Sequence, residues 1–289
     1  MEFKPVSAEQ FDSDPIKNAM TIDVEDYFQV SAFSNNISLD EWRNHDCRVE
    51  QNMARILELF DQHNVKGTFF TLGWIAQHYP NVVKQIVAQG HELASHGRNH
   101  VRAYDQSPKE FSDDIRSTKQ MLEDLGGVEV KGYRAASFSI DERNLWAYDC
   151  LAEAGYRYSS SIYPVQHDHY GMPNAPRFSF YAHDSGLIEV PISTVQLMNR
   201  LWPSGGGGYF RFFPYAVSKQ LIQTVNEKEK RSAIFYLHPW EIDPEQPKQK
   251  NIQLKTRFRH YVNLQRTYGR LGKLLQDFSW GRMDKVFSV

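Results

Sequence analysis

The sequence is poor in cysteine and has no long apolar run, and each absence excludes a class of protein. Only two of its 289 residues are cysteines, Cys47 and Cys150, too few for a disulfide framework and too isolated for a zinc knuckle. No stretch approaches the ~18–20 consecutive apolar residues of a membrane span, and the first residues show no basic region followed by an apolar one. We therefore expect free thiols, no transmembrane segment and a cytoplasmic protein.

Net charge is nearly absent as well. The chain has 33 Lys and Arg residues against 35 Asp and Glu, a formal net charge of −2, so it lacks the basic surplus of a nucleic-acid-binding protein. With 41% hydrophobic and 13% aromatic residues it has ample material for a core, which excludes disorder of the whole chain. We expect no nucleic-acid partner, and the sequence indicates no oligomeric state.

Apolar spacing predicts alternating strands and helices. A strand at 18–22 is followed by a helix at 49–62, whose apolar residues fall on one face. The pattern then continues with strands at 65–71, 92–95, 130–134, 156–160, 187–192 and 232–237, and with helices at 74–88, 108–125, 142–154 and 216–229. Such alternation, about seven units long, favours βαβ units and a parallel α/β sheet or barrel. The proline-rich stretch 163–214 is expected to form loops around the strand at 187–192.

The composition changes after residue 241. A linker at 243–248 precedes apolar residues with helical spacing from Phe258 to Phe278, and no acidic residue lies between Lys248 and Gln276. A basic amphipathic helix could face a membrane surface or an anionic polymer. We favour a helix docked on the rest of the chain, and therefore divide the sequence into a main domain, 1–241, and a C-terminal extension, 242–289.

Three carboxylates crowd into four positions directly after the first predicted strand. They are Asp23, Glu25 and Asp26. Like charges repel at this spacing, and the carboxyl end of a parallel strand is the usual place for active-site residues, so the cluster indicates a cation site. The alternative is an acidic turn whose carboxylates cap backbone amides.

Two histidines, His96 and His100, follow the strand at 92–95. Side chains four residues apart share a face of a helical turn and can bind one metal ion. The alternative is a chance surface pair, since the chain has 11 histidines. Gly97 stands where the His-Glu-x-x-His pattern needs its glutamate, so the segment is not that of a zincin protease.

Two further strands end in residues that can carry chemistry. Arg134 could hold a carboxylate through a bidentate contact, although a surface ion pair is the alternative. His238 follows the apolar strand at 232–237 and should lie on the rim of the barrel, as a functional group or as a satisfied polar cap. Trp240 offers a flat apolar face of the kind that stacks on sugar rings.

A run of four glycines at 205–208 does not form a known phosphate-binding loop, because no Gly-Lys-Ser/Thr and no Gly-x-Gly-x-x-Gly accompanies it. We interpret it as a flexible loop beside the substrate. Four aromatic residues that follow are candidate contacts, although core packing is favoured for them: Tyr209, Phe210, Phe212 and Phe213.

The four segments around Asp23, His96, Arg134 and His238, in this order, resemble the polysaccharide deacetylase family, which is carbohydrate esterase family 4 with the NodB-homology fold. The resemblance runs from Asp23 to His238. The sequence Asp-Val-Glu-Asp-Tyr-Phe, with the C-terminal extension, is similar to the subset associated with bacterial exopolysaccharide loci and exosortase systems. The resemblance implies a distorted (β/α)7 barrel with a C-terminal helical extension. For the domain 1–241 it implies a hydrolase that removes N-acetyl groups from an amino-sugar polysaccharide or its precursor and releases acetate.

The resemblance also implies roles for the residues that match the motifs of the family: Asp23 as catalytic base, His96 and His100 as metal ligands, Arg134 as the residue that orients the base, and His238 as general acid. The first motif departs from the usual pair of adjacent aspartates, so the third ligand is Glu25 or Asp26. Spacing does not decide between them, and we slightly favour Asp26.

The remaining implications concern substrate and cofactor. Ser137 ends the third motif, whose usual Arg-x-Pro-Tyr is replaced here, which puts its backbone donor to an oxyanion in question. Ser137, Tyr27 and Trp240 are the expected contacts to an N-acetylated carbohydrate. Two imidazoles and a carboxylate with an open position favour Zn²⁺, and Co²⁺, Fe²⁺ or Mn²⁺ also fit such ligands.

Two alternatives stay open at this point. The same fold could hydrolyse another non-peptide C–N bond, as the similar allantoinase-like amide hydrolases do. The altered first and third motifs also leave room for a non-catalytic carbohydrate-binding or assembly protein.

Overall fold

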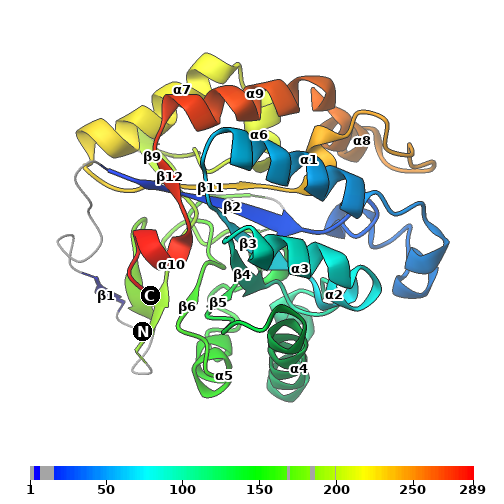
Figure 1. The fold of residues 1–289 in the computed structure, drawn as a ribbon. Helices are drawn as coiled ribbons and strands as arrows, with labels where there is room; N and C mark the ends of the chain where they lie inside the picture. The colour runs from blue at the N-terminus through cyan, green and yellow to red at the C-terminus, as the bar shows by residue number, and fades with distance from the viewer. Residues whose placement is uncertain (1–2, 7–15, 168–169, 183–185, 199) are drawn as a thin grey trace.

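Seven parallel strands form the centre of the computed structural model, which describes residues 3–6, 16–167, 170–182, 186–198 and 200–289 (Figure 1). In spatial order they are β8 (Leu187–Glu189), β6 (Tyr158–Ser159), β5 (Gly132–Tyr133), β4 (Glu92–Ser95), β3 (Thr68–Thr71), β2 (Asn18–Val24) and β11 (Ile234–Leu237). Two antiparallel strands extend the sheet beyond β8, namely β7 (Phe180–Ala182) and β1 (Lys4–Pro5). The predicted α/β class and the count of parallel strands are confirmed.

Most helices pack on one face of the curved sheet. In Figure 1, α1 (Val49–Gln62) and α7 (Tyr215–Gln223) are drawn above β2, and α2 (Gly73–His78), α3 (Pro80–Ala88), α4 (Pro108–Gly126) and α5 (Ala147–Glu153) are drawn below it. Buried residues of α1, α3, α4, α5 and α7 share one hydrophobic cluster with Met20 and Ile22 of β2, whereas Ala19 packs in a second cluster on the other face. All seven residues of β2 are therefore buried. The predicted helix at 74–88 is two helices, since Pro80 lacks the backbone N–H that would continue the first one.

The gap between β8 and β11 is filled by irregular chain rather than by a described strand. The Ile234 backbone N–H donates to Ser193 Oγ at 2.7 Å, and the Tyr236 N–H donates to the Gly205 carbonyl at 2.7 Å. A small hairpin of β9 (Thr194–Leu197) and β10 (Arg200–Pro203) lies between these contacts in sequence. The irregular segment accounts for the distortion that the resemblance implied.

The glycine run at 205–208 is not a flexible loop, contrary to expectation. It starts α6 (Gly207–Phe212), and Gly206 has a φ of 110°. A Cβ at Gly206 would lie 2.2 Å from the Tyr236 carbonyl oxygen, so glycine is required for this close approach to β11. The aromatic residues that follow differ in burial: Phe210 is buried, as expected for core packing, whereas Phe212 is 56% exposed.

The C-terminal extension packs back onto the sheet domain. Helices α8 (Leu254–Tyr261) and α9 (Leu264–Asp277) lead to the short strand β12 (Trp280–Gly281) and to α10 (Met283–Val286). The apolar face of α9 is buried, including Leu271 and Leu274, and β12 pairs with the start of β2. Among the helices of the described ranges, none is long and apolar enough to span a membrane.

Short helical turns complete the described chain. The 3-10 turns are η2 (Ser31–Phe33), η3 (Leu39–Asn44), η4 (Ala103–Asp105), η5 (Ala136–Phe138) and η7 (Pro239–Ile242), and η6 (Thr224–Lys228) is a π-helical turn after α7. Two of them, η2 and η7, are the first elements after β2 and β11 in the chain, and both contribute residues near the carboxyl ends of these strands.

Candidate active site

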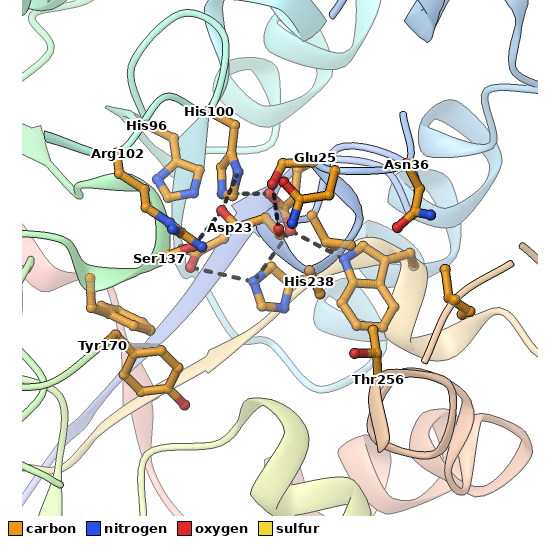
Figure 2. Close-up of a pocket in the computed structure, with 18 of the residues that line it drawn as sticks. Asp23, Glu25, Asn36, His96, His100, Arg102, Ser137, Tyr170, His238 and Thr256 are labelled. Atoms are coloured by element: carbon orange, nitrogen blue, oxygen red, sulfur yellow. Dashed lines mark hydrogen bonds and ion pairs between the residues drawn. The ribbon is translucent and has the colours of Figure 1, made fainter. Parts of the chain in front are cut away.

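Four parallel strands each deliver a polar side chain to the same end of the sheet. Asp23 is the penultimate residue of β2, His96 follows β4, Arg134 follows β5 and His238 follows β11. The carboxyl ends of parallel strands share one edge, so these residues meet although more than 200 positions separate the first from the last. Figure 2 shows Asp23, Glu25, His96, His100 and His238 around one opening.

Glu25, His96 and His100 form a cluster with the composition of a metal site. One ligand atom from each residue lies within 4.8 Å of those of the other two. His100 Nε2 is 2.9 Å from Glu25 Oε2, and yet Oε2 makes no hydrogen bond of good geometry with any described residue. A buried carboxylate oxygen left in this state fits a site that holds a cation.

The hydrogen bonding of His96 prepares it as a ligand. His96 Nδ1 lies 2.8 Å from the Arg134 carbonyl oxygen, which can only accept, so Nδ1 carries the proton. The lone pair is therefore on Nε2, the arrangement found in metal-binding histidines. Burial lowers the pKa of His96 to about 4, which keeps the imidazole neutral at pH 7.

Glu25 is ionised despite its burial. Desolvation by itself would raise its pKa, but the nearby imidazoles of His100 and His238 lower the pKa to about 2. The Trp240 indole N–H also donates to Glu25 Oε1 at 3.3 Å. The carboxylate is thus charged and held in orientation, and it fits a divalent ion shared with the two imidazoles.

Asp26 is turned away from this cluster, so the slight preference for it as the third ligand is wrong in geometry. Its carboxylate accepts from the Tyr27 and Arg48 backbone N–H groups and from the Cys47 thiol at 3.1 Å, just before α1 begins. Burial raises its pKa to about 6. The chain turns directly after β2, where the Glu25 N–H donates to the Asp23 carbonyl at 3.0 Å, and only Asp23 and Glu25 of the three carboxylates line the cavity.

Asp23 is held by a buried arginine. Arg134 is fully buried, and its NH1 donates to Asp23 Oδ1 at 2.6 Å and to Thr21 Oγ1 at 2.8 Å. Its Nε and NH2 donate to the backbone and side-chain oxygens of Ser160. With its donors committed in this way, the guanidinium fixes the orientation of Asp23, as the resemblance implied.

His238 is held by a carboxylate that the sequence analysis missed. Its Nδ1 donates to Glu241 Oε1 at 2.7 Å, which leaves Nε2 3.8 Å from Asp23 Oδ2 and 3.6 Å from Glu25 Oε1. Burial alone would lower the pKa of His238, but Glu25, Glu241 and Asp23 together raise it to about 9. Glu241 stands three residues after His238, on the same turn η7, and this spacing could have identified it.

Glu241 in turn depends on Arg211 of α6. Arg211 Nε donates to Glu241 Oε2 at 2.6 Å, and both side chains are buried. Burial alone would raise the pKa of Glu241, but Arg211 and His238 lower it to about 2. Arg211 NH1 also donates to the His260 carbonyl at 2.6 Å, so the pair links His238 to the C-terminal helix α8.

The three expected substrate contacts lie in different environments. Ser137 lines the cavity and donates to Ser31 Oγ at 2.7 Å, with a φ of 53°. Tyr27 is 1% exposed and packs against Phe28, so the prediction that it contacts substrate is wrong for this geometry. Trp240 is 5% exposed and stacks with His238, so it orients site residues instead of offering a free face to a sugar.

A cavity of about 670 Å³ opens over these residues. Asp23, Glu25, His96, His100 and His238 line it, and Asp26 and Tyr27 do not. The other walls come from η2, from the loop before α8 and from Phe138 and Tyr170. The site therefore combines a cation-binding cluster, a fixed carboxylate and a fixed imidazole in one pocket wide enough for a small organic group and part of a longer molecule.

The protein thus has a mixed α/β fold with a mostly parallel sheet, and a cluster with the composition of a metal site stands at the carboxyl ends of its strands. Residues 40–159 match the family model for "Polysaccharide deacetylase", as the resemblance of the motifs predicted. Residues 160–288 match a second model, a domain of unknown function, DUF3473, in agreement with the resemblance to the exopolysaccharide-associated subset. His96, His100 and Arg134 lie in the first match and His238 lies in the second.

Curated relatives are deacetylases of amino-sugar polymers. The chain is 37% identical over 94 residues to a peptidoglycan-N-acetylglucosamine deacetylase of Bacillus cereus, a match that covers 32% of this chain and 34% of the relative. It is 27% identical over 116 residues to a chitooligosaccharide deacetylase of Bradyrhizobium sp., covering 40% of this chain and 48% of the relative. The chain thus spans a third to a half of the length of these relatives.

Solved structures share the fold. A candidate polysaccharide deacetylase from Mycobacterium smegmatis superposes with a TM-score of 0.62 at 18% sequence identity, covering 99% of this chain and 92% of that one. The peptidoglycan N-acetylglucosamine deacetylase Bc1960 gives a TM-score of 0.51 at 17% identity, with 94% and 88% covered. These matches confirm the fold class along the chain.

Proposed function

We propose that the protein is a metal-dependent hydrolase that removes N-acetyl groups from an amino-sugar polysaccharide or its precursor and releases acetate. One observation carries the proposal: the Glu25, His96 and His100 cluster faces the same cavity as two charged pairs, Asp23 with Arg134 and His238 with Glu241. The names of the curated relatives support the substrate class.

Glu25, His96 and His100 would hold the ion, with Zn²⁺ favoured and Co²⁺, Fe²⁺ or Mn²⁺ also compatible with these ligands. When bound, a divalent ion supplies Lewis-acid activation of water and of a carbonyl group. Trp240 supports the ion site by holding Glu25 Oε1.

The two fixed groups divide the proton transfers between them. Asp23 takes the proton from the attacking water, and Arg134 keeps the carboxylate in position to do so. His238 carries a proton on Nε2 to the amine nitrogen as the C–N bond breaks, because an amine leaves poorly as an anion. Glu241 fixes the tautomer of His238 by accepting from Nδ1.

The test is acetate release from N-acetylhexosamine oligomers by protein loaded with Zn²⁺. The proposal requires acetate together with a free amine on the sugar, and the absence of acetate from every N-acetylated sugar would refute it. Acetate-free hydrolysis of cyclic amides would support the other amide-hydrolase alternative. Protein that takes up no stoichiometric divalent ion, even after reconstitution, would point to the carbohydrate-binding alternative.

A second measurement separates His238 from the ion site. His238→Ala should slow turnover while bound metal stays at the level of the unaltered protein, because Nε2 serves the leaving nitrogen and not the ion. Equal loss of metal and turnover would contradict this assignment.

A further inference from the structure

A second cavity, of about 420 Å³, continues from the central one. The two cavities share five lining residues: Val30, Ala32, Tyr170, Trp240 and Thr256. Tyr170 and Thr256 lie on the side of His238 away from His96 and His100 in Figure 2, so the second cavity leads away from the ion cluster. A molecule seated over the cluster can therefore extend into this space.

Aromatic side chains of two helices form the wall of the second cavity. Phe212 at the end of α6 is 56% exposed, and Phe258 in α8 is 57% exposed. Their ring centroids are 6.3 Å apart, at an interplanar angle of 80°. Leaving two large aromatic side chains more than half exposed costs apolar burial, and such side chains beside an active-site cavity are typical of ligand-binding surfaces.

The wall is mixed in character, which distinguishes it from a packed core. Lys255, Thr256 and Arg259 of α8 line the same cavity as Phe258. Aromatic faces next to a few polar hydrogen-bonding groups match the surface of a pyranose ring, which has apolar C–H faces and a rim of oxygen atoms. None of the residues that line this cavity within the described ranges is acidic.

We propose that the second cavity binds the sugar residue next to the one whose acetamide lies over the ion cluster, with Phe258 and Phe212 as its stacking surface. The C-terminal segment would thereby make the protein prefer oligomers over single sugars. The proposal rests on the proposed function for its substrate class, and it assigns a role to helices α6 and α8, which lie in the segment matched by the domain of unknown function.

Calorimetric titration with N-acetylglucosamine and with its pentamer tests the proposal. The unaltered protein should bind the pentamer more tightly than the monomer. Phe258→Ala should weaken pentamer binding about tenfold, the size of one lost aromatic contact, and should weaken monomer binding less. Phe258→Trp keeps an aromatic face and should retain the preference for the pentamer.

A matched control lies on the same helix. Leu254 is 84% exposed and lines neither cavity, so Leu254→Ala should bind both sugars as the unaltered protein does. Equal affinity of the unaltered protein for monomer and pentamer, no binding of either sugar, or equal effects of Phe258→Ala and Leu254→Ala would each overturn the inference.

The same variants separate the inference from the proposed function. If Phe258→Ala weakens pentamer binding but no metal-loaded protein releases acetate, the aromatic subsite stands and the proposed reaction fails. If acetate is released from monomer and pentamer at equal kcat/KM and with equal affinity, the reaction stands and the subsite fails.

Discussion

Replacing the two adjacent acidic residues after β2, one at a time, tests whether Glu25 is the ion ligand and Asp26 instead accepts from backbone N–H groups before α1. Glu25→Gln and Asp26→Asn are both isosteric and both remove one negative charge, but only Glu25 lies in the cluster with His96 and His100. Removing an outer-shell partner of a metal ligand typically costs ~10–100-fold in affinity. Replacing Glu25, the only carboxylate of this cluster, should therefore weaken metal affinity more than 100-fold, which corresponds to about 2.7 kcal/mol of binding free energy.

Asp26→Asn should affect stability instead. Its carboxylate accepts from two backbone N–H groups and from Cys47, and weakening a buried charge-assisted acceptor costs about 1–3 kcal/mol. For a chain of this size we expect Tm to fall by about 2–4 °C for each kcal/mol. Chelator competition measures the metal affinity of each variant, and thermal unfolding of the metal-free proteins measures stability.

The two variants should differ in metal binding. Glu25→Gln should lose metal, and Asp26→Asn should keep metal while the Tm of the metal-free protein falls. The reverse pattern would refute the assignment of the third ligand to Glu25, and loss of metal in both variants would show that the two side chains act together.

Three further perturbations follow from buried contacts. Glu241→Gln should lower the free energy of unfolding by about 3 kcal/mol or more in urea titrations, because it leaves the buried Arg211 without its charge partner; an unchanged midpoint would contradict the pairing. His91 is buried and its pKa is lowered to about 4 by desolvation, with smaller contributions from nearby positive charges, below its ordinary 6.5. As pH falls, the unfolded chain therefore binds the His91 proton before the folded protein does. The contribution of His91 to the free energy of unfolding is fully present above pH 6.5, and about 3 kcal/mol of it is lost between pH 6.5 and 4. His91→Gln should flatten this pH dependence in the same titrations. Gly206→Ala should cost about 3 kcal/mol or prevent folding, because its Cβ meets the Tyr236 carbonyl at 2.2 Å; a variant as stable as the parent would disprove the close approach.

Elements with a strong local signal were predicted well from the sequence. The helix at 49–62 and the strand at 92–95 have the predicted bounds. The helix has apolar residues along the one face that packs on the core, and every residue of the strand is buried, so both patterns are visible in the sequence. Pro80, by contrast, stands inside a regular apolar pattern, and the prediction followed the pattern instead of the missing N–H. The hairpin of β9 and β10 and the strand β12 were missed, because short strands take their register from distant partners.

In the candidate site, the residues that take part were predictable from the sequence, but the orientation of some side chains was not. Asp23, His96, His100, Arg134 and His238 come together as the positions of their strands required. The orienting role of Trp240 could not be predicted from the sequence, because it depends on how the indole packs against His238 and Glu25 in three dimensions. Glu241 was missed although it stands three residues after His238, whereas its pairing with Arg211, 30 residues away on a different helix, depends on the fold.

The pairing of β12 with β2 has a consequence for the order in which the chain can reach its final structure. On one side, β2 pairs with β11 along Ala19–Ile22. On the other side, the first two residues of β2 pair with β12, and its last four residues pair with β3. During synthesis, the first half of β2 therefore waits for segments made more than 200 residues later. A nascent chain stalled after residue 241 would carry an unsatisfied sheet edge at the start of β2, the end of the strand opposite the ion cluster. Ribosome-bound chains of increasing length would acquire protease resistance only as residue 281 clears the exit tunnel.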